Sequence, residues 1–178
     1  MNVAEVLEQI RLAMPYISGI TVSGGEATLQ PEFVWQLFKE IKEHREFSQL
    51  TTFIDSNGAA PQKIWDLLAP FTDAVMVDLK VLDDVKHIAL TGSSNELVLN
   101  SIKYLDFINK LFEVRLLLVP GQNDSNEELI RTRAWLKSIN PTVKIKLNAF
   151  TTHGVRASAR DWPEVNQSDL FRYKAIIS

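Results

Sequence analysis

Cysteine is absent from this sequence of 178 residues. Its absence excludes disulfide bonds, thiolate zinc sites, a cysteine nucleophile and any iron–sulfur cluster with cysteine ligands from these residues. Long apolar runs are also lacking, and no stretch approaches the roughly 18 residues that a membrane-spanning helix needs. The first five residues, Met1 to Glu5, carry no basic segment of the kind that opens a secretory signal. We therefore expect a cytoplasmic protein without a membrane partner.

An excess of charge of one sign is lacking as well. The net charge is -3, from 19 basic and 22 acidic residues that are interspersed along the chain, so we expect no nucleic-acid partner. The three histidines, His44, His87 and His153, have no metal-ligand spacing, and the sequence contains no P-loop or G-x-G-x-x-G motif. The length suits one hydrophobic core, and no linker divides the chain. The sequence predicts a single domain over residues 1–178.

Short β-branched runs alternate with stretches of helical periodicity. The expected strands cover residues 19–23, 51–55, 74–78, 113–119 and 143–150. The expected helices cover residues 3–14, 31–41, 61–69, 94–107, 125–138 and a weak one from 167. Capping-box spacing is present at Asn2 with Glu5 and at Ser125 with Glu128, and Asp83-Asp84 is interpreted as a helix start. Repeats of about 25–35 residues predict an α/β fold with about five parallel strands and right-handed crossovers.

Polar residues gather where the expected strands end. The endings are Ser23-Gly24-Gly25-Glu26, Asp55-Ser56-Asn57-Gly58, Asp78-Leu79-Lys80, Pro120-Gly121 and Asn148 to His153. Ligands of parallel α/β folds bind at the carboxyl ends of the strands, so these groups are expected on one rim. Each ending also has a plainer interpretation, as a tight turn, ordinary turn residues, a simple ion pair or an exposed loop histidine.

The chemistry of this rim suits a small zwitterion. Gly24 and Gly25 expose backbone polar groups, and Glu26 offers an acceptor to an ammonium group. Lys80 can pair with a carboxylate, alone or through a cation held by Asp55 and Asp78. An amino-acid-like ligand is therefore predicted. Lys144, Lys146 and Asn148 give the last expected strand one polar face, which suits either a barrel interior or a solvated edge.

In this order the motifs resemble those of the pyruvate formate-lyase activating enzyme family. The carriers of the resemblance are Ser23 to Glu26, Asp55 to Gly58, Val75 to Lys80, Arg115 to Gly121, and Asn148 to Phe150 followed by His153-Gly154. Members of this family are radical S-adenosylmethionine (SAM) enzymes that abstract hydrogen from a glycine of a partner enzyme. The match runs from about Asn2 to Trp162. It implies a partial (β/α)6 TIM-like barrel of the radical SAM type, of which this chain holds five strands.

The resemblance also implies a role for each matching residue. Ser23, Gly24, Gly25 and Glu26 match the motif that holds the SAM amino group. Asp55, Ser56, Met76 and Asp78 match positions around a monovalent cation near the SAM carboxylate, and Asn57 belongs to the same loop motif. Lys80 matches the lysine that reaches this carboxylate. Arg115 matches a strand arginine that faces the site, and His153 matches a histidine near the SAM ribose.

The sequence departs from the family in one respect. Family members carry a C-x-x-x-C-x-x-C loop after their first strand, which ligates a [4Fe–4S] cluster, and no such loop is present here. That strand and loop are expected upstream of Met1, and the family's final strand also lies outside the match. SAM is the expected cofactor of this chain, and the [4Fe–4S] cluster is expected only in the intact parent protein. The implied partners are a glycyl radical enzyme and an electron donor such as flavodoxin or ferredoxin. We expect no catalytic residue in this chain and no catalysis by it alone.

Two alternatives remain open on the sequence. The chain could be a non-catalytic module that docks onto a glycyl radical enzyme or a cluster-bearing chain, because an uncovered sheet edge favours a partner. Alternatively, Lys80 beside Asp78 could be the Schiff-base nucleophile of a barrel lyase.

Overall fold

A computed structural model gives the fold of this protein and describes residues 2–155 and 157–177. The strands are β1 (Gly19–Val22), β2 (Thr51–Ser56), β3 (Ala74–Leu79), β4 (Leu111–Leu118) and β5 (Ile145–Ala149). They form one parallel sheet in the order β1-β2-β3-β4-β5, with β1 and β5 at its edges. This confirms the predicted α/β fold with five parallel strands. The last strand is shorter than expected.

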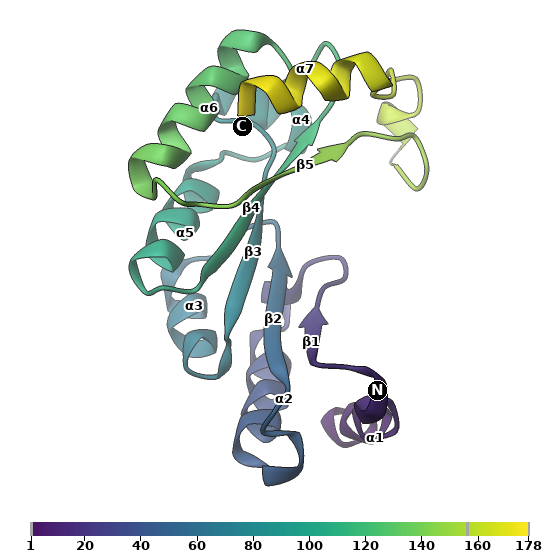
Figure 1. Ribbon diagram of the computed structural model, residues 1–178, viewed down its shortest axis with the longest axis vertical. Coiled ribbons are helices and arrows are strands. Elements are labelled where there is room, and N and C mark those ends of the chain that lie inside the picture. The colour runs from purple at the N-terminus through teal and green to yellow at the C-terminus, as the bar shows by residue number, and fades with distance from the viewer. Residues whose placement is uncertain (1, 156, 178) are drawn as a thin grey trace.

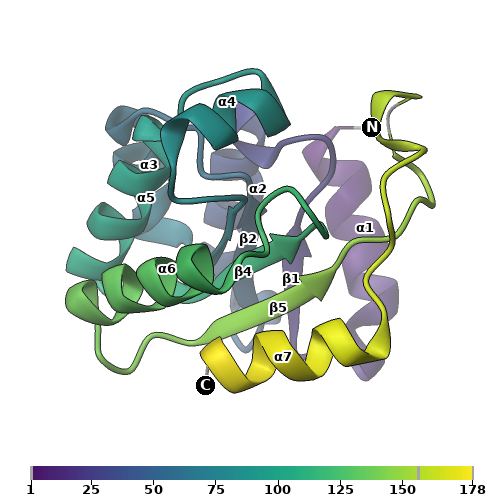
Figure 2. The same ribbon diagram turned by 90° about the horizontal axis from the view of Figure 1, so that it is seen from above.

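Helices connect the strands and cover one side of the sheet. They are α1 (Val3–Ala13), α2 (Pro31–Glu43), α3 (Gln62–Leu68), α4 (Asp84–Thr91), α5 (Glu96–Phe107), α6 (Asn126–Ile139) and α7 (Gln167–Ile177). Figure 1 shows α3, α5 and α6 along one side of the twisted sheet. Seen from above in Figure 2, α1 and α7 lie apart from this row. Helix α1 packs on α2, and α7 packs on α6 and β5.

The predicted helix starts have the expected caps. Asn2 and Glu5 form a reciprocal capping box at α1, and the Ser125 side chain accepts the Glu128 N–H at the start of α6. Asp83 is the N-cap of α4 and accepts the Lys86 N–H, which confirms this aspartate as part of a helix start. Local sequence therefore determines where these helices begin.

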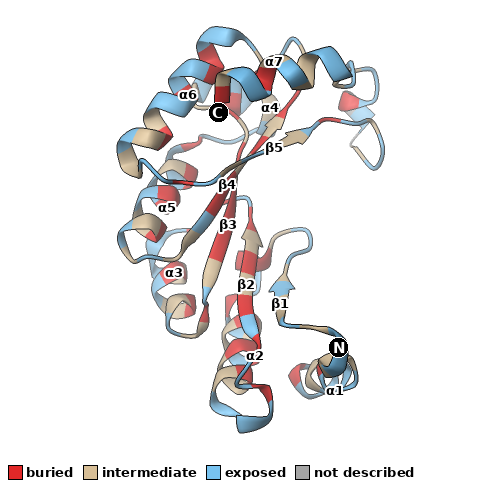
Figure 3. Cartoon of the chain, viewed as in Figure 1, coloured by how far each residue is buried: buried red, intermediate tan, exposed pale blue. Residues whose placement is uncertain are grey.

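The main apolar core lies between the sheet and the helices. Figure 3 shows buried residues along β3 and β4 and on the sheet-facing sides of the helices. The core includes Ile54, Val77 and Val114 from the strands, each 0% exposed, and Trp65 from α3. Parallel strands with this burial are typical of a sheet covered by crossover helices.

The other side of the sheet carries a group of charged side chains. Because side chains alternate along a strand, Asp55 of β2, Met76 and Asp78 of β3, and Glu113 and Arg115 of β4 share this side, which we call the polar face. The pairing of β3 with β4 is irregular between Val75 and Met76, where the register shifts. Within residues 2–155 and 157–177, no helix is long and apolar enough to cross a membrane.

Candidate functional site

The loop after β1 presents exposed backbone at the carboxyl rim of the sheet. Ser23, Gly24 and Gly25 are all exposed. Gly24 has a φ of +133°, a conformation that favours glycine, and a Cβ built on either glycine meets no atom within 4 Å. The peptide groups of this loop are therefore accessible to a ligand.

Glu26 joins this loop to the loop after β2. Its Oε1 accepts hydrogen bonds from the Thr28 N–H (3.0 Å), the Thr28 hydroxyl (2.7 Å) and the Ser56 hydroxyl (2.8 Å). Its Oε2 accepts the Asn57 N–H at 2.8 Å. The carboxylate thus positions Ser56 and Asn57. Its expected role as an acceptor for an ammonium group stays a prediction.

The turn after Asn57 is also held by residues of α3 and α5. Gly58 has a φ of +75°, and a Cβ there would lie 2.7 Å from Val77 Cγ1, so glycine is required by both conformation and space. The buried Ser101 hydroxyl of α5 donates to the Gly58 carbonyl at 2.7 Å and accepts the Trp65 indole N–H at 2.7 Å. The rim loop after β2 is thereby fixed to both α3 and α5.

A charged network crosses the polar face. Arg115 donates from Nη1 to Asp55 Oδ2 at 2.7 Å and from Nε to Glu113 Oε1 at 2.8 Å. Its Nη2 lies 2.6 Å from Met76 Sδ. Lys144 Nζ lies 3.1 Å from Glu113 Oε2, so this glutamate, only 2% exposed, has two cationic partners.

Burial and pairing oppose each other in this network. Burial raises the pKa of Glu113, but the hydrogen bonds and charges of Arg115 and Lys144 outweigh it, and the pKa is lowered from its ordinary value. Burial likewise disfavours charged Arg115, but Glu113 and Asp55 outweigh it and raise its pKa. Glu113 and Arg115 are therefore both ionised at neutral pH.

Lys80 follows β3 and pairs with Asp78 across 2.7 Å. The two side chains are 27% and 29% exposed, so solvent and ligands can reach both. The Lys80 carbonyl accepts a hydrogen bond of 2.6 Å from the amide of Asn123, in the loop after β4.

A largely apolar cavity of about 330 Å³ opens beside Lys80. Its walls come from the carboxyl end of β4, from α4 and from the segment after β5; they are formed by Lys80, Leu90, Thr91, Leu117, Val119, Asn123, Phe150, Val155, Ala159 and Trp162. The Phe150 and Trp162 rings lie 5.8 Å apart between centroids. A cation at the border of an aromatic cavity suits a ligand with one charged and one flat apolar end.

The other predicted residues lie in less constrained surroundings. His153 is exposed in a turn after β5. The buried His87 bonds through Nδ1 to the Ser93 carbonyl at 2.8 Å. Within the part of the chain that the structure describes, no group of three or more His, Asp or Glu side chains could hold a metal ion. The predicted monovalent cation at Asp55, Ser56, Met76 and Asp78 stays a prediction.

Sequence reasoning missed Glu113 and Asn123. A glutamate inside an apolar strand, at Leu111–Leu118, signals a buried charge pair, and this signal was available. Of the turn that contains Asn123, only Pro120-Gly121 was predicted at the rim, as a strand ending. The contacts of Asn123 with Lys80, 43 residues away, have no local signal.

Comparison with known proteins shows the family of this chain. The model of the radical SAM superfamily matches residues 1–133. Pyruvate formate-lyase-activating enzyme of Staphylococcus aureus is 32% identical over 161 residues, which are 87% of this chain and 64% of the relative. The chain thus spans 64% of the length of this curated relative.

Solved structures share the fold at lower sequence identity. A domain of pyruvate-formate lyase-activating enzyme from Bacteroides vulgatus has a TM-score of 0.72 and 21% identity, over 90% of this chain and 93% of that one. Streptococcus suis SuiB bound to its precursor peptide SuiA has a TM-score of 0.75 and 16% identity, over 99% of this chain and 38% of that one. These structures confirm the partial TIM-like barrel.

Proposed function

Because this chain belongs to the radical SAM superfamily, we propose that it is the SAM-binding portion of a glycyl-radical enzyme activase. The observation that carries the proposal is the placement of Lys80 between an ion pair with Asp78 and the apolar cavity at the carboxyl rim. The identity of 32% to an activating enzyme supports the same activity class.

The groups on the rim fit the two ends of SAM. Lys80 supplies a cation for the carboxylate, and the exposed peptide groups of Gly24 and Gly25 lie in the loop after β1, at the same carboxyl rim, for the amino group. Leu117, Phe150 and the other apolar walls suit the adenine ring. Bound SAM supplies a cleavable carbon–sulfur bond. The residues of this chain bind and orient it.

The cluster does not fit these residues. None of the 178 residues is a cysteine, so they offer no thiolate to a [4Fe–4S] cluster. In the proposed activase, cysteines outside these residues would hold the cluster, which would pass the one electron that reductive cleavage of SAM requires from a donor such as flavodoxin or ferredoxin. The partner would be a glycyl radical enzyme, whose glycine would give up a hydrogen atom.

The alternative of a Schiff-base lyase has less support. A lysine nucleophile needs a free amine, whereas Nζ of Lys80 is engaged in an ion pair with Asp78 at 2.7 Å. The alternative of a non-catalytic docking module is also compatible with SAM binding. It differs from the proposal only in whether the complex of this chain with its partner carries out catalysis.

Calorimetric titration of the chain with SAM tests the proposal. We expect weak binding, and we expect Lys80→Met to raise the Kd for SAM by roughly 10-fold or more, because the variant loses a charge-assisted hydrogen bond. Lys103→Met is the matched control, because Lys103 lies on α5 beside Trp135, away from the rim. Equal binding by the two variants, or no binding at millimolar SAM, would contradict the proposed site.

A further inference from the structure

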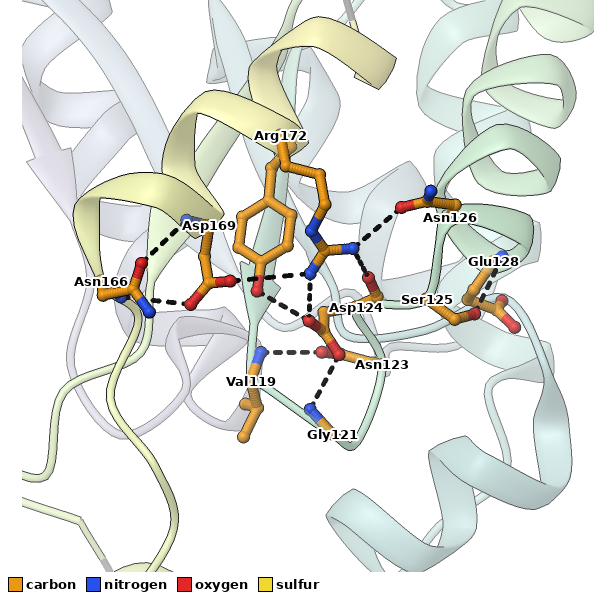
Figure 4. Close-up of polar contacts among 11 residues, drawn as sticks. Val119, Gly121, Asn123, Asp124, Ser125, Asn126, Glu128, Asn166, Asp169 and Arg172 are labelled. Carbon is orange, nitrogen blue, oxygen red and sulfur yellow. Dashed lines mark hydrogen bonds and ion pairs between the residues drawn. The ribbon is translucent and has the colours of Figure 1, made fainter.

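The loop between β4 and α6, residues 119–125, connects the candidate site to α7. Figure 4 shows its polar contacts, with Arg172 and Asp169 of α7 on one side and the start of α6 on the other. Asn123 and Asp124 are neighbours in this loop, and their side chains serve different partners.

Asn123 faces the sheet. Its Nδ2 donates to the Lys80 carbonyl at 2.6 Å and to the Leu117 carbonyl at 2.8 Å, and its Oδ1 accepts the Val119 N–H at 2.7 Å. The residue is 3% exposed, so these bonds are shielded from water. The amide therefore fixes the backbone of Lys80 against the end of β4, and both ends of this bridge border the apolar cavity.

Asp124 faces α7. Its Oδ2 accepts Arg172 Nη2 at 2.6 Å and the Tyr173 hydroxyl at 2.9 Å, and its Oδ1 accepts the Gly121 N–H at 2.8 Å. Arg172 Nη1 donates to the Asp124 carbonyl at 2.8 Å. Tyr173 is 0% exposed. One carboxylate thus ties the helix and the turn together.

The ionised form of Asp124 is the one that this arrangement stabilises. Burial raises the pKa of its carboxyl group, but Tyr173, the Gly121 N–H and Arg172 outweigh burial and lower the pKa. Burial and the bond to Asp124 raise the pKa of the Tyr173 hydroxyl, which keeps it a donor. The contact persists throughout the neutral pH range.

We propose that Asn123 and Asp124 are positioning residues for Lys80, so that the docking of α7 determines where the Lys80 ammonium stands at the cavity. Asp124 holds the loop to α7, and Asn123 transmits the position of the loop to the backbone from which the Lys80 side chain extends. What Lys80 binds rests on the proposed function; the mechanical connection rests on the contacts alone.

The test compares two aspartates with similar surroundings at opposite ends of the sheet. Asp124→Asn weakens the tie to α7. Asp73→Asn weakens a comparable cluster, in which Asp73 accepts the Thr52 N–H at 2.8 Å and lies 2.5 Å from Lys42 Nζ. Asn123→Ala breaks the bridge directly, and Tyr173→Phe removes one bond from Asp124 without emptying the core.

Two signals report on Lys80 independently of SAM. These are the ¹³Cε signal of its side chain and the ¹⁵N signal of Val81, whose peptide bond contains the Lys80 carbonyl. We expect Asp124→Asn, Tyr173→Phe and Asn123→Ala to shift both signals, and Asp73→Asn to leave them unchanged. For SAM, we expect Asp124→Asn to raise the Kd roughly 3- to 10-fold, in the range of measured couplings between residues in contact networks.

Two outcomes would overturn the proposal. In one, Asp124→Asn leaves the Lys80 and Val81 signals as unchanged as Asp73→Asn does. In the other, only Asn123→Ala moves them, which would remove α7 from the connection. If the unmodified chain fails to bind SAM, the proposed function is wrong, whereas the two signals still decide whether α7 positions Lys80.

Discussion

The Ser56 hydroxyl donates to Glu26 Oε1 across 2.8 Å, and this bond joins the loops after β1 and β2. Glu26 also receives the Asn57 N–H, so a residue expected to contact the ligand already organises the rim. The exposed Gly24 and Gly25 backbone is held beside it. Preorganisation of this kind reduces the entropy that a ligand has to overcome on binding.

Glu26→Gln tests this organising role. A carboxamide keeps one oxygen as an acceptor and replaces the other oxygen with an NH2 donor. The glutamine therefore cannot accept both the Asn57 N–H and the hydrogen bonds that Oε1 accepts in Glu26. We expect a loss of roughly 1–3 kcal/mol in the free energy of unfolding, measured with urea. Glu32→Gln, at an exposed position in the first turn of α2, is the control and should change little. Equal effects of both variants would assign Glu26 no organising role.

Gly58→Ala tests whether space as well as conformation requires glycine. The new Cβ would lie 2.7 Å from Val77 Cγ1 at a φ of +75°, so we expect a loss of roughly 2–4 kcal/mol. Gly92→Ala has a similar φ, +86°, with no atom within 4 Å, and should lose only about 1 kcal/mol. Thermal or urea unfolding of the pair separates strain from the clash. Similar losses would show that the turn relaxes around the methyl group.

Arg115→Met tests the network on the polar face. Among the described residues, the change leaves Glu113, 2% exposed, with Lys144 as its one cationic partner, and we expect a loss of roughly 3 kcal/mol in the free energy of unfolding. Adding Glu113→Gln to this variant removes the buried charge that has lost one of its two partners, and should restore part of the stability. A double variant no more stable than Arg115→Met would mean that packing against Met76, and not charge, explains the loss.

Acid should destabilise the chain through its paired carboxylates. The pKa values of Asp73 and Asp124 are lowered in the folded state, so the unfolded state binds protons first as the pH falls. Their contribution is complete above the unfolded pKa of about 4 and is lost as the pH falls through the lower folded values. Urea unfolding at several pH values from about 5 downward measures this loss of stability.

Asp124→Asn should make that decline shallower, because the variant lacks one of the linked protons. Its free energy of unfolding should be lower than that of the unmodified chain at pH 7 and should approach it at low pH. Parallel curves for the two proteins would contradict the lowered pKa of Asp124.

The sequence alone determined the order of the elements and the positions of several caps. Alternating strands and helices are local patterns, and Asn2, Asp83 and Ser125 cap helices within a few residues of themselves. The gathering of polar strand ends followed from parallel pairing, because all carboxyl ends then meet at one rim. The proposed roles of those residues came from resemblance.

Only the tertiary structure decided which side chains pair across the rim and the polar face. Arg115 reaches Asp55, 60 residues away, because β2, β3 and β4 lie side by side in one particular register. The irregularity at Met76 brings Glu113 opposite that residue. Periodicity specifies which face a residue shares with its near neighbours, whereas the contacts of Asn123 and Asp124 depend on how whole elements dock.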